Sequence, residues 1–390
     1  MARWNQQVDN LTHHIYFRAC SFVIIAIGFL TGHPILFFMG SLYFVYFVVS
    51  YYYLSNVGKR LKLTIANGQI KLFPGETGVI KLKLEQPSWL PIFSGHIQLV
   101  TDNNIEFLNG DRSTRISKIS LPFSLMGNSE VVIDIPFTAR ERGVAKLHHI
   151  ELQISHFIDF GKVYLQKNDL TKFEVLVYSE QVPVTGLERI MPKNQGTYPT
   201  RSSLFEDVST IIGTRDYTAG DSFNKIHWKA SAKVTSLQTK MYEKTAQYSW
   251  LIVFDIRSGN LEERIKGITH LIHHATKFHI PYSLLVNIKK VGTPSYLELP
   301  YGEGKRHLQT ALTMLARLQG NSVSISMPAF EKITLQHAAH SPYVILCGEK
   351  ERLSGWKMPS GINVNLLDVK DDSCTLLSLR TEARKEAVNG

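Results

Sequence analysis

Cysteine is scarce in this sequence: Cys20, Cys347 and Cys374 are the only three among 390 residues. No two of them form a CxxC pair, and none has the spacing of a zinc-ligand set. Secreted domains that depend on disulfides carry more cysteines at closer spacing. We therefore expect a reducing compartment, and we predict neither a disulfide framework nor a cofactor.

Two other patterns are missing. The sequence contains no GxxxxGK[ST] loop, so this chain is not itself an ATPase of that class. Its net charge is +10, yet no basic stripe interleaved with aromatic residues runs through it, so nucleic-acid binding is not predicted. A modest basic excess instead suits a body held near anionic lipid.

Charged residues are also absent from one long apolar segment, residues 35–54, and a second apolar segment, 15–31, contains only Arg18. A helix of about 20 residues spans a hydrocarbon core about 30 Å thick. Because three residues separate the segments, we predict a transmembrane helical hairpin within residues 1–60. A cleaved signal peptide would show one shorter apolar core and a small-residue cleavage site, which this sequence lacks.

Basic residues flank the predicted hairpin on one side. Arg3 and Arg18 lie before or early in the first helix, and Lys59, Arg60 and Lys62 follow the second. The loop between the helices has no lysine or arginine. By the positive-inside rule, we expect a multi-pass integral protein of the cell membrane whose soluble body is cytoplasmic, with the lipid bilayer as its first partner.

The next segment, 61–182, changes to a period of two. Ile80, Leu82 and Leu84 alternate with charged residues, which places apolar side chains on one face of a strand. Several short strands of this kind must bury their faces against a second sheet. We predict a β-sandwich of immunoglobulin-like type, followed by a linker at 183–204 that is rich in Pro, Gly, Ser and Thr.

Strands alternate with helices over residues 205–372, which predicts an α/β domain with a mainly parallel sheet, and we interpret 373–390 as a C-terminal tail. The expected strands are 250–255, 282–288, 343–347 and 364–369, and the expected helices are 261–279 and 305–318.

A dense group of polar, aromatic and small residues lies within 213–242. This segment resembles the domain of unknown function 58 family, whose core motif reads approximately R-x-Y-x-x-G-D-x-x-x-x-I-x-W-x-x-S-A. The matching residues are Arg215, Tyr217, Gly220, Asp221, Ile226, Trp228, Ser231 and Ala232. A looser match to the family lies upstream, at residues 158–162. We also expect Asp221 to cap the helix that follows it.

The resemblance implies a helical hairpin, a β-sandwich and a domain like the von Willebrand factor A domain. Such proteins are commonly associated with MoxR-type AAA+ ATPases. We therefore expect a non-enzymatic adaptor that works with such an ATPase in assembly or cell-envelope processes. The motif residues and His227 would form the partner site, and a homo-oligomer or a purely structural cell-envelope role is left open.

Two alternatives remain for the motif. Asp221, His227 and Ser231 are the residue types of a nucleophilic triad, which would make the protein a hydrolase, although no GxSxG elbow surrounds Ser231. In the structural alternative, Trp228 anchors the segment in a core while Arg215 and Asp221 form a hydrogen-bonded pair that fixes the loop.

The resemblance also points to a degenerate metal site. Von Willebrand-like domains bind Mg²⁺ through Asp-x-Ser-x-Ser, whereas this chain has Asp255, Arg257, Ser258 and Gly259 in that segment. We predict no metal there, because an arginine repels a divalent cation, and we expect Arg257 to pair with Asp255 instead.

Three histidines, His270, His273 and His274, share one face of the expected helix 261–279 with Lys266 and Lys277. We expect a solvated basic face there and no metal site.

Overall fold

The computed structural model describes residues 4–9, 11–66, 68–108, 111–112, 116–156, 161–167, 173–190, 198–199, 206–246, 248–339, 341–359, 362–370 and 373–379. The chain divides into two compact units, of which the first ends at Tyr178 and the second begins at Ser179.

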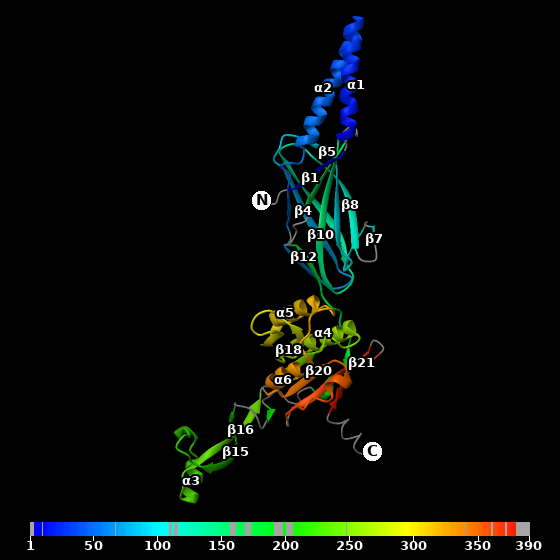
Figure 1. The fold of residues 1–390 in the computed structure, drawn as a ribbon. Coiled ribbons are helices and arrows are strands. Elements are labelled where there is room, and N and C mark those ends of the chain that lie inside the picture. Colours follow the sequence, from blue (N-terminus) through cyan, green and yellow to red (C-terminus); the bar gives the residue numbers. More distant parts are fainter. Residues whose placement is uncertain are drawn as a thin grey trace. The chain divides into compact units, whose positions relative to one another are not determined.

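The first unit begins with two paired helices, α1 (Leu11–Thr31) and α2 (Pro34–Asn56) (Figure 1). They approach closely at two glycines: a Cβ added at Gly28 would lie 2.5 Å from the backbone nitrogen of Phe37, and one at Gly40 would lie 2.9 Å from that of Ile25. Small residues commonly permit such contact between apolar helices. Among the described residues, only α2 is long and apolar enough to cross a membrane, since the apolar part of α1 covers Arg18–Thr31.

A β-sandwich follows, as the alternating pattern predicted. Its larger sheet contains β1 (Asn5–Asp9), β3 (Gln69–Leu72), β5 (Ile92–Asp102), β7 (Asp111–Arg112), β8 (Ile116–Leu125), β10 (Gly143–Ser155), β11 (Lys162–Lys167) and β12 (Glu174–Val177). The smaller sheet contains β2 (Lys62–Ile65), β4 (Thr77–Gln86), β6 (Ile105–Phe107) and β9 (Ser129–Ala139). Neighbouring strands are antiparallel, except that β3 and β12 are parallel.

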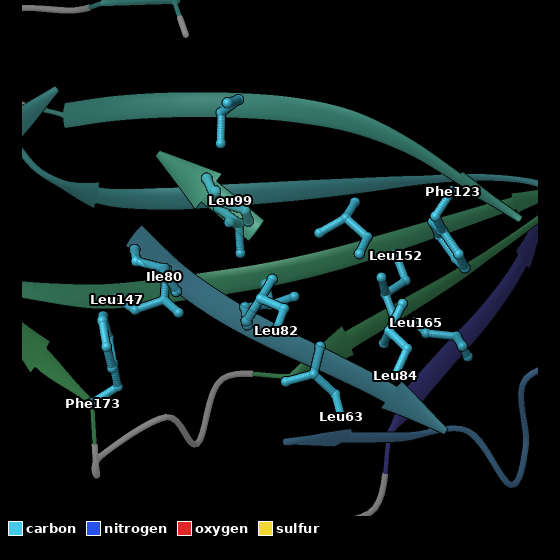
Figure 2. Packing of buried hydrophobic residues seen from close by; sticks show 14 of the residues in the cluster. Leu63, Ile80, Leu82, Leu84, Leu99, Phe123, Leu147, Leu152, Leu165 and Phe173 are labelled. Carbon is cyan, nitrogen blue, oxygen red and sulfur yellow. The ribbon is translucent and has the colours of Figure 1, made fainter. Parts of the chain in front are cut away.

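The sandwich is held by one apolar core (Figure 2). Ile80, Leu82 and Leu84 of β4 are fully buried in it, which confirms the alternation read from the sequence. The core also contains Leu54 from the end of α2 and Val57 just after it. The last turn of α2 is therefore part of the sandwich interior.

Residues 5–9, which we assigned to the helical hairpin, instead form a strand of the sandwich. This strand, β1, pairs antiparallel with β11. Its sequence, NQQVD, has no apolar alternation, because an edge strand of this kind is held by backbone hydrogen bonds to an existing sheet. The chain thus leaves the strands of the sandwich after Asp9 and returns to them at Lys62.

The second unit contains a mainly parallel sheet, as predicted. Its order is β13 (Val184–Thr185), β22 (Ser373–Ser378), β21 (Asn363–Lys370), β20 (Tyr343–Cys347), β17 (Trp250–Phe254), β18 (Tyr282–Lys289) and β19 (Tyr296–Gly302). The helices are α4 (Leu261–Lys277), α5 (Gly304–Arg317), α6 (Met327–Ala338) and α7 (Lys350–Leu353). The central strands β17, β18, β20 and β21 run parallel, while β19 and β22 are antiparallel to their neighbours β18 and β21.

Two predicted boundaries differ from this sheet. Residues 373–378, which we interpreted as part of a tail, form β22, and Val184–Thr185 of the expected linker form β13 beside it. Both strands gain backbone hydrogen bonds at the edge of a sheet, which local composition does not reveal. Residues 191–197, 200–205 and 380–390 lie outside the described residues.

A second, small sheet belongs to the same unit. It consists of β14 (Tyr198–Pro199), β15 (Glu206–Asp216) and β16 (Gln238–Ala246). The short helix α3 (Trp228–Val234) and the 3-10 turn η2 (Phe223–Lys225) lie between β15 and β16, and another 3-10 turn, η1 (Leu187–Arg189), follows β13. This small sheet carries the motif.

The histidines of α4 do not form the solvated basic face that we expected. His270, His273 and His274 are half-buried, and the His274 ring stacks on Trp250 with centroids 6.1 Å apart. The helix packs beside α5 and the sheet, so its histidine side is partly covered. Burial lowers the pKa of each of these three histidines, and it also lowers the pKa of His307 on α5.

We predict that acid weakens the α/β unit. A buried neutral histidine resists a proton that the unfolded chain accepts with a pKa of about 6.5, so the stability is fully present above that pH and is lost as the pH falls below it. Chemical unfolding followed by tryptophan fluorescence should show an earlier midpoint at about pH 5 than at about pH 7.5. His274→Gln should reduce the difference, and equal midpoints in the native chain would contradict the prediction.

Candidate functional site

The polar, aromatic and small residues of 213–242 gather at the end of the ribbon that β15 and β16 form. Strand β15 ends at Asp216, β16 begins at Gln238, and the paired residues include Arg215 with Thr239. We call residues 215–239 the ribbon tip. An isolated bridge between Ile226 and Thr239 joins the intervening segment to β16, and Ile226 is buried.

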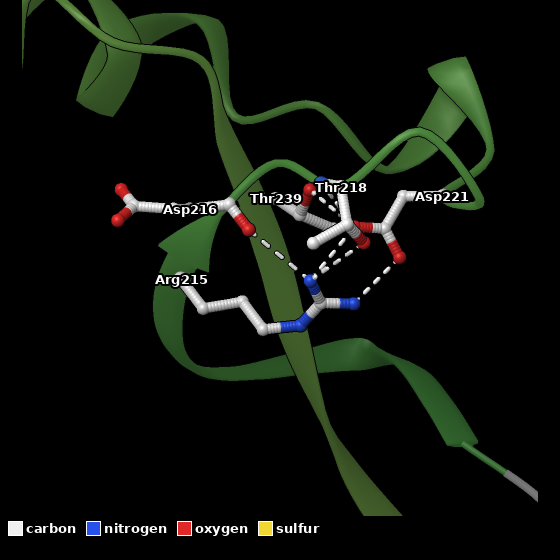
Figure 3. Close-up of polar contacts among 5 residues, drawn as sticks. All are labelled: Arg215, Asp216, Thr218, Asp221 and Thr239. Carbon is white, nitrogen blue, oxygen red and sulfur yellow. Dashed lines mark hydrogen bonds and ion pairs between the residues drawn. The ribbon is translucent and has the colours of Figure 1, made fainter.

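A bidentate ion pair between Arg215 and Asp221 links the end of β15 to the loop that follows it in this tip (Figure 3). The Arg215 guanidinium donates through Nη1 to Oδ2 of Asp221 at 2.8 Å and through Nη2 to Oδ1 at 2.5 Å. Such forked pairing of arginine with a carboxylate fixes geometry as well as charge. The pairing of Arg215 with Asp221 was expected in the structural alternative, and the structure shows it.

Asp221 has further donors. Thr218 donates from its backbone nitrogen at 3.1 Å and from its hydroxyl at 3.0 Å, and the Thr239 hydroxyl donates at 3.2 Å. Arg215 and these bonds hold the pKa of the Asp221 carboxyl well below its usual range. The stabilisation from this pair is therefore present above the ordinary aspartate pKa of about 3.9 and is lost only as the pH falls through the lowered value.

The helix cap differs from our expectation. Asp221 is occupied by Arg215 and the two threonines, and the residue that caps α3 is His227, whose Nδ1 accepts from the backbone nitrogen of Ala230 at 3.1 Å. Asp221 lies seven positions before the helix, so the turn η2 places it too far from the first helical amides.

Ser231 fastens α3 to the ribbon. Its hydroxyl donates to the backbone carbonyl of His227 at 3.0 Å and accepts from the backbone nitrogen of Gln238 at 2.8 Å. The Gln238 amide in turn donates to Asp216 at 2.5 Å. Small residues suit this position because Ser231 is buried between the helix and β16.

The side chains of the three residues of the hydrolase alternative thus form hydrogen bonds with other groups and not with one another. Asp221 accepts hydrogen bonds from Arg215 and from two threonines, His227 accepts one from the backbone nitrogen of Ala230, and Ser231 bonds to backbone atoms. Among the described residues, no hydrogen bond joins these three side chains to one another as a catalytic triad requires.

Trp228 is not the core anchor that the structural alternative assumed. Its side chain is 65% exposed, and Phe223 is 68% exposed. Among the described residues of the tip, the buried side chains are those of Ile226, Ser231, Gln238 and Thr239, so the two aromatic rings lie outside this small buried group. The other motif residues fall between these extremes: Arg215, Gly220 and Ala232 are exposed, and Tyr217 and His227 are half-buried.

A second aspartate with several polar neighbours lies in the sheet of the α/β body: Asp255, directly after β17. Asp255 is fully buried, and its Oδ1 accepts from Asn287 at 2.5 Å and from the backbone nitrogen of Arg257 at 3.0 Å. Its Oδ2 forms an ion pair with Arg352 at 3.1 Å. Within the described part of the chain, no group of three metal-ligating side chains gathers.

The cation beside Asp255 is therefore Arg352, and our expectation of the Arg257 side chain was wrong. Arg257 bends away, donating to the Ser324 hydroxyl at 3.0 Å. Sequence reasoning also missed Asn287. A usable indication was that Asn287 lies near the carboxyl end of β18 and that Arg352 comes soon after β20, because the carboxyl ends of parallel strands meet at one edge of the sheet.

The fold defines the class of protein: an N-terminal helical pair, a β-sandwich and a mainly parallel α/β sheet. No family model matches this chain, so the family resemblance stays an expectation. The uncharacterized protein YeaD of Bacillus subtilis is 24% identical over 142 residues, which is 36% of this chain and 35% of that relative. The chain thus spans about a third of the length of the curated relative it matches.

Solved structures similar to about 30% of this chain include cohesins. The non-cellulosomal cohesin from Archaeoglobus fulgidus is 13% identical, with a TM-score of 0.21, over 30% of this chain and 92% of that one. CaCohA2 from Clostridium acetobutylicum is 15% identical, with a TM-score of 0.20, over 30% and 90%. The immunoglobulin-like type that we expected for the sandwich stays a prediction.

Exchanging each arginine tests which one neutralises Asp255. Arg352→Met should lower the free energy of unfolding by about 3 kcal/mol, because it leaves a buried carboxylate without its cation. Arg257→Met, the matched control, removes hydrogen bonds to surface groups and should lower it by only about 1 kcal/mol. Equal losses in urea unfolding would contradict the assignment of the charge to Arg352.

Asp221→Asn should loosen the ribbon tip while leaving the α/β body intact. The neutral amide loses the ion pair with Arg215, so the amides of Tyr217 and Thr218 should exchange hydrogen faster, as measured by mass spectrometry. Lys229→Ala, a change at an exposed neighbour on α3, is the control and should leave these rates unchanged. Unaltered exchange in Asp221→Asn would show that the pair does not hold the tip.

Proposed function

We propose that this protein is a non-enzymatic, membrane-anchored interaction protein whose ribbon tip binds a partner protein. The observation that supports this most is the exposure of Trp228 and Phe223 on a tip whose backbone is fixed by the Arg215–Asp221 pair. Exposed aromatic residues dominate binding energy at interfaces, and a tip that is already ordered loses little entropy on binding.

The charge of the tip indicates an acidic partner surface. Both carboxylates of the tip are engaged within it, Asp221 by Arg215 and Asp216 by Gln238. The cations Lys229 and Lys233 are exposed on α3, four residues apart and beside Trp228. A partner that places acidic groups around an apolar pocket would complement this arrangement. The MoxR-type AAA+ ATPase implied by the family resemblance is our proposed partner.

Membrane anchoring is the second part of the proposal. Since β1 precedes α1 and β2 follows α2 in the same sandwich, the two helices leave and return at one body. This topology supports a retained hairpin whose two ends lie on the same side of the membrane, because cleavage after α1 would remove β1 from its sheet. The basic residues that flank the hairpin are the support for a cytoplasmic body. A single spanning helix or a signal segment is the alternative for α2 alone.

Trp228→Ala tests the interaction. Because Trp228 is exposed, the variant should fold normally, while its affinity for the partner should fall by at least about tenfold, as expected for an aromatic hot spot. Cross-linked co-purification from cells should recover a AAA+ ATPase with the native chain and much less of it with the variant. Trp89→Ala is the matched control, since Trp89 is equally exposed on the sandwich.

Equal recovery with Trp228→Ala would contradict a partner site at the tip. Failure to recover any ATPase with the native chain would contradict the proposed partner but leave the anchoring part of the proposal to its own test. Activity-based labelling of Ser231 in the folded chain would support the hydrolase alternative instead.

A further inference from the structure

Two loops at one end of the sandwich are joined to each other and to α2. They are the β4–β5 loop, residues 87–91, and the β8–β9 turn, residues 126–128. Asn128 donates from its backbone nitrogen to the carbonyl of Ser88 at 3.0 Å. The Tyr53 hydroxyl, on the last turns of α2, donates to the carbonyl of Pro91 at 2.8 Å. We call these two loops the helix-end loops.

The helix-end loops have the composition of a membrane surface rather than of an aqueous one. Trp89 and Met126 are each 67% exposed, and Phe93, just beyond the first loop, is 55% exposed. Residues 86–94 and 125–129 contain no charged side chain. Turns that face water usually carry polar residues, and a cluster of large exposed apolar side chains marks a contact surface.

The length of α2 indicates the depth of this surface. From Pro34 to Tyr53 the helix has about 20 residues, which span about 30 Å, the thickness of a hydrocarbon core. Tyr53 would then lie at the boundary between lipid tails and headgroups, and Pro91 is hydrogen-bonded to it. The His156 ring also meets the rings of Tyr46 and Tyr53, at 6.2 and 5.5 Å, so this end of the sandwich overlaps the last turns of α2.

We infer that the helix-end loops lie in the headgroup layer of the bilayer that α2 enters, with Trp89 and Met126 inserted among the lipids. This inference rests on the membrane anchoring proposed above. Tryptophan is suited to that layer, because its ring is apolar while its indole nitrogen can bond to headgroups. Lys59 and Arg60, exposed at the end of α2, supply cations for lipid phosphates at the same end.

Fluorescence quenching tests the inference in the full-length chain. The protein is reconstituted into phosphatidylcholine–phosphatidylglycerol vesicles with and without lipids brominated near the headgroup. The native chain is compared with Trp89→Ala, and the difference between them isolates the emission of Trp89. We expect brominated lipid to remove most of that difference and iodide in the water to remove little. Trp228→Ala is the matched control, whose difference should respond to iodide and not to brominated lipid.

Two outcomes would overturn the inference. Quenching of the Trp89 emission by iodide but not by brominated lipid would place the loop in water. Protection from both quenchers would show that a protein surface or a second copy covers it.

Extraction of the native chain from vesicles by alkaline carbonate tests the anchor separately. If the chain stays in the vesicles but lipid does not reach Trp89, only this inference is refuted. If carbonate extracts the chain, the membrane anchoring itself is refuted.

Discussion

The entry of α2 into the sandwich core is the constraint on which the first unit depends. Leu54 at the end of the helix, and Val57 and Leu61 just after it, are buried in the same cluster as the strands. Each such side chain contributes about 2 kcal/mol when it is buried. The helix therefore cannot move relative to the strands without opening the core. Because this junction is rigid, the length of α2 indicates where the sandwich lies relative to the bilayer that the helix would enter.

Arginine–carboxylate pairs have a comparable role in the second unit. Arg215 holds Asp221 at the ribbon tip, and Arg352 holds Asp255 at the end of β17. Each aspartate also accepts hydrogen bonds from neighbouring groups, so both help to fix the shape of a loop. At the tip, lysines and aromatic rings are among the groups that face outward.

The sequence was sufficient for the elements whose apolar residues repeat regularly. The alternation in β4 and the runs of β17 and β20 predicted the two domains and their types. The sequence was insufficient where an element forms through backbone pairing, as for β1 and β22, which are held by neighbouring strands. It was also insufficient for contacts between distant residues, since Arg352 lies 97 positions from Asp255 in the sequence. The prediction that Trp228 is buried was wrong for a related reason: a large aromatic residue usually indicates a hydrophobic core, and the ribbon tip is too small to bury this one. For the candidate site, the motif identified the Arg215–Asp221 pair, but not the exposure of the residues around it.

Trp89 and Trp228 show why exposure alone does not identify a partner. Their exposed fractions are nearly the same, 67% and 65%. Trp89 is surrounded in sequence by uncharged residues and is tied to the end of an apolar helix, an environment that suits lipid. Trp228 is followed directly by Lys229 on a helix capped and fastened by polar bonds, an environment that suits a protein surface with acidic groups. From the neighbouring charges and from the element that holds each ring, we propose different partners for the two tryptophans.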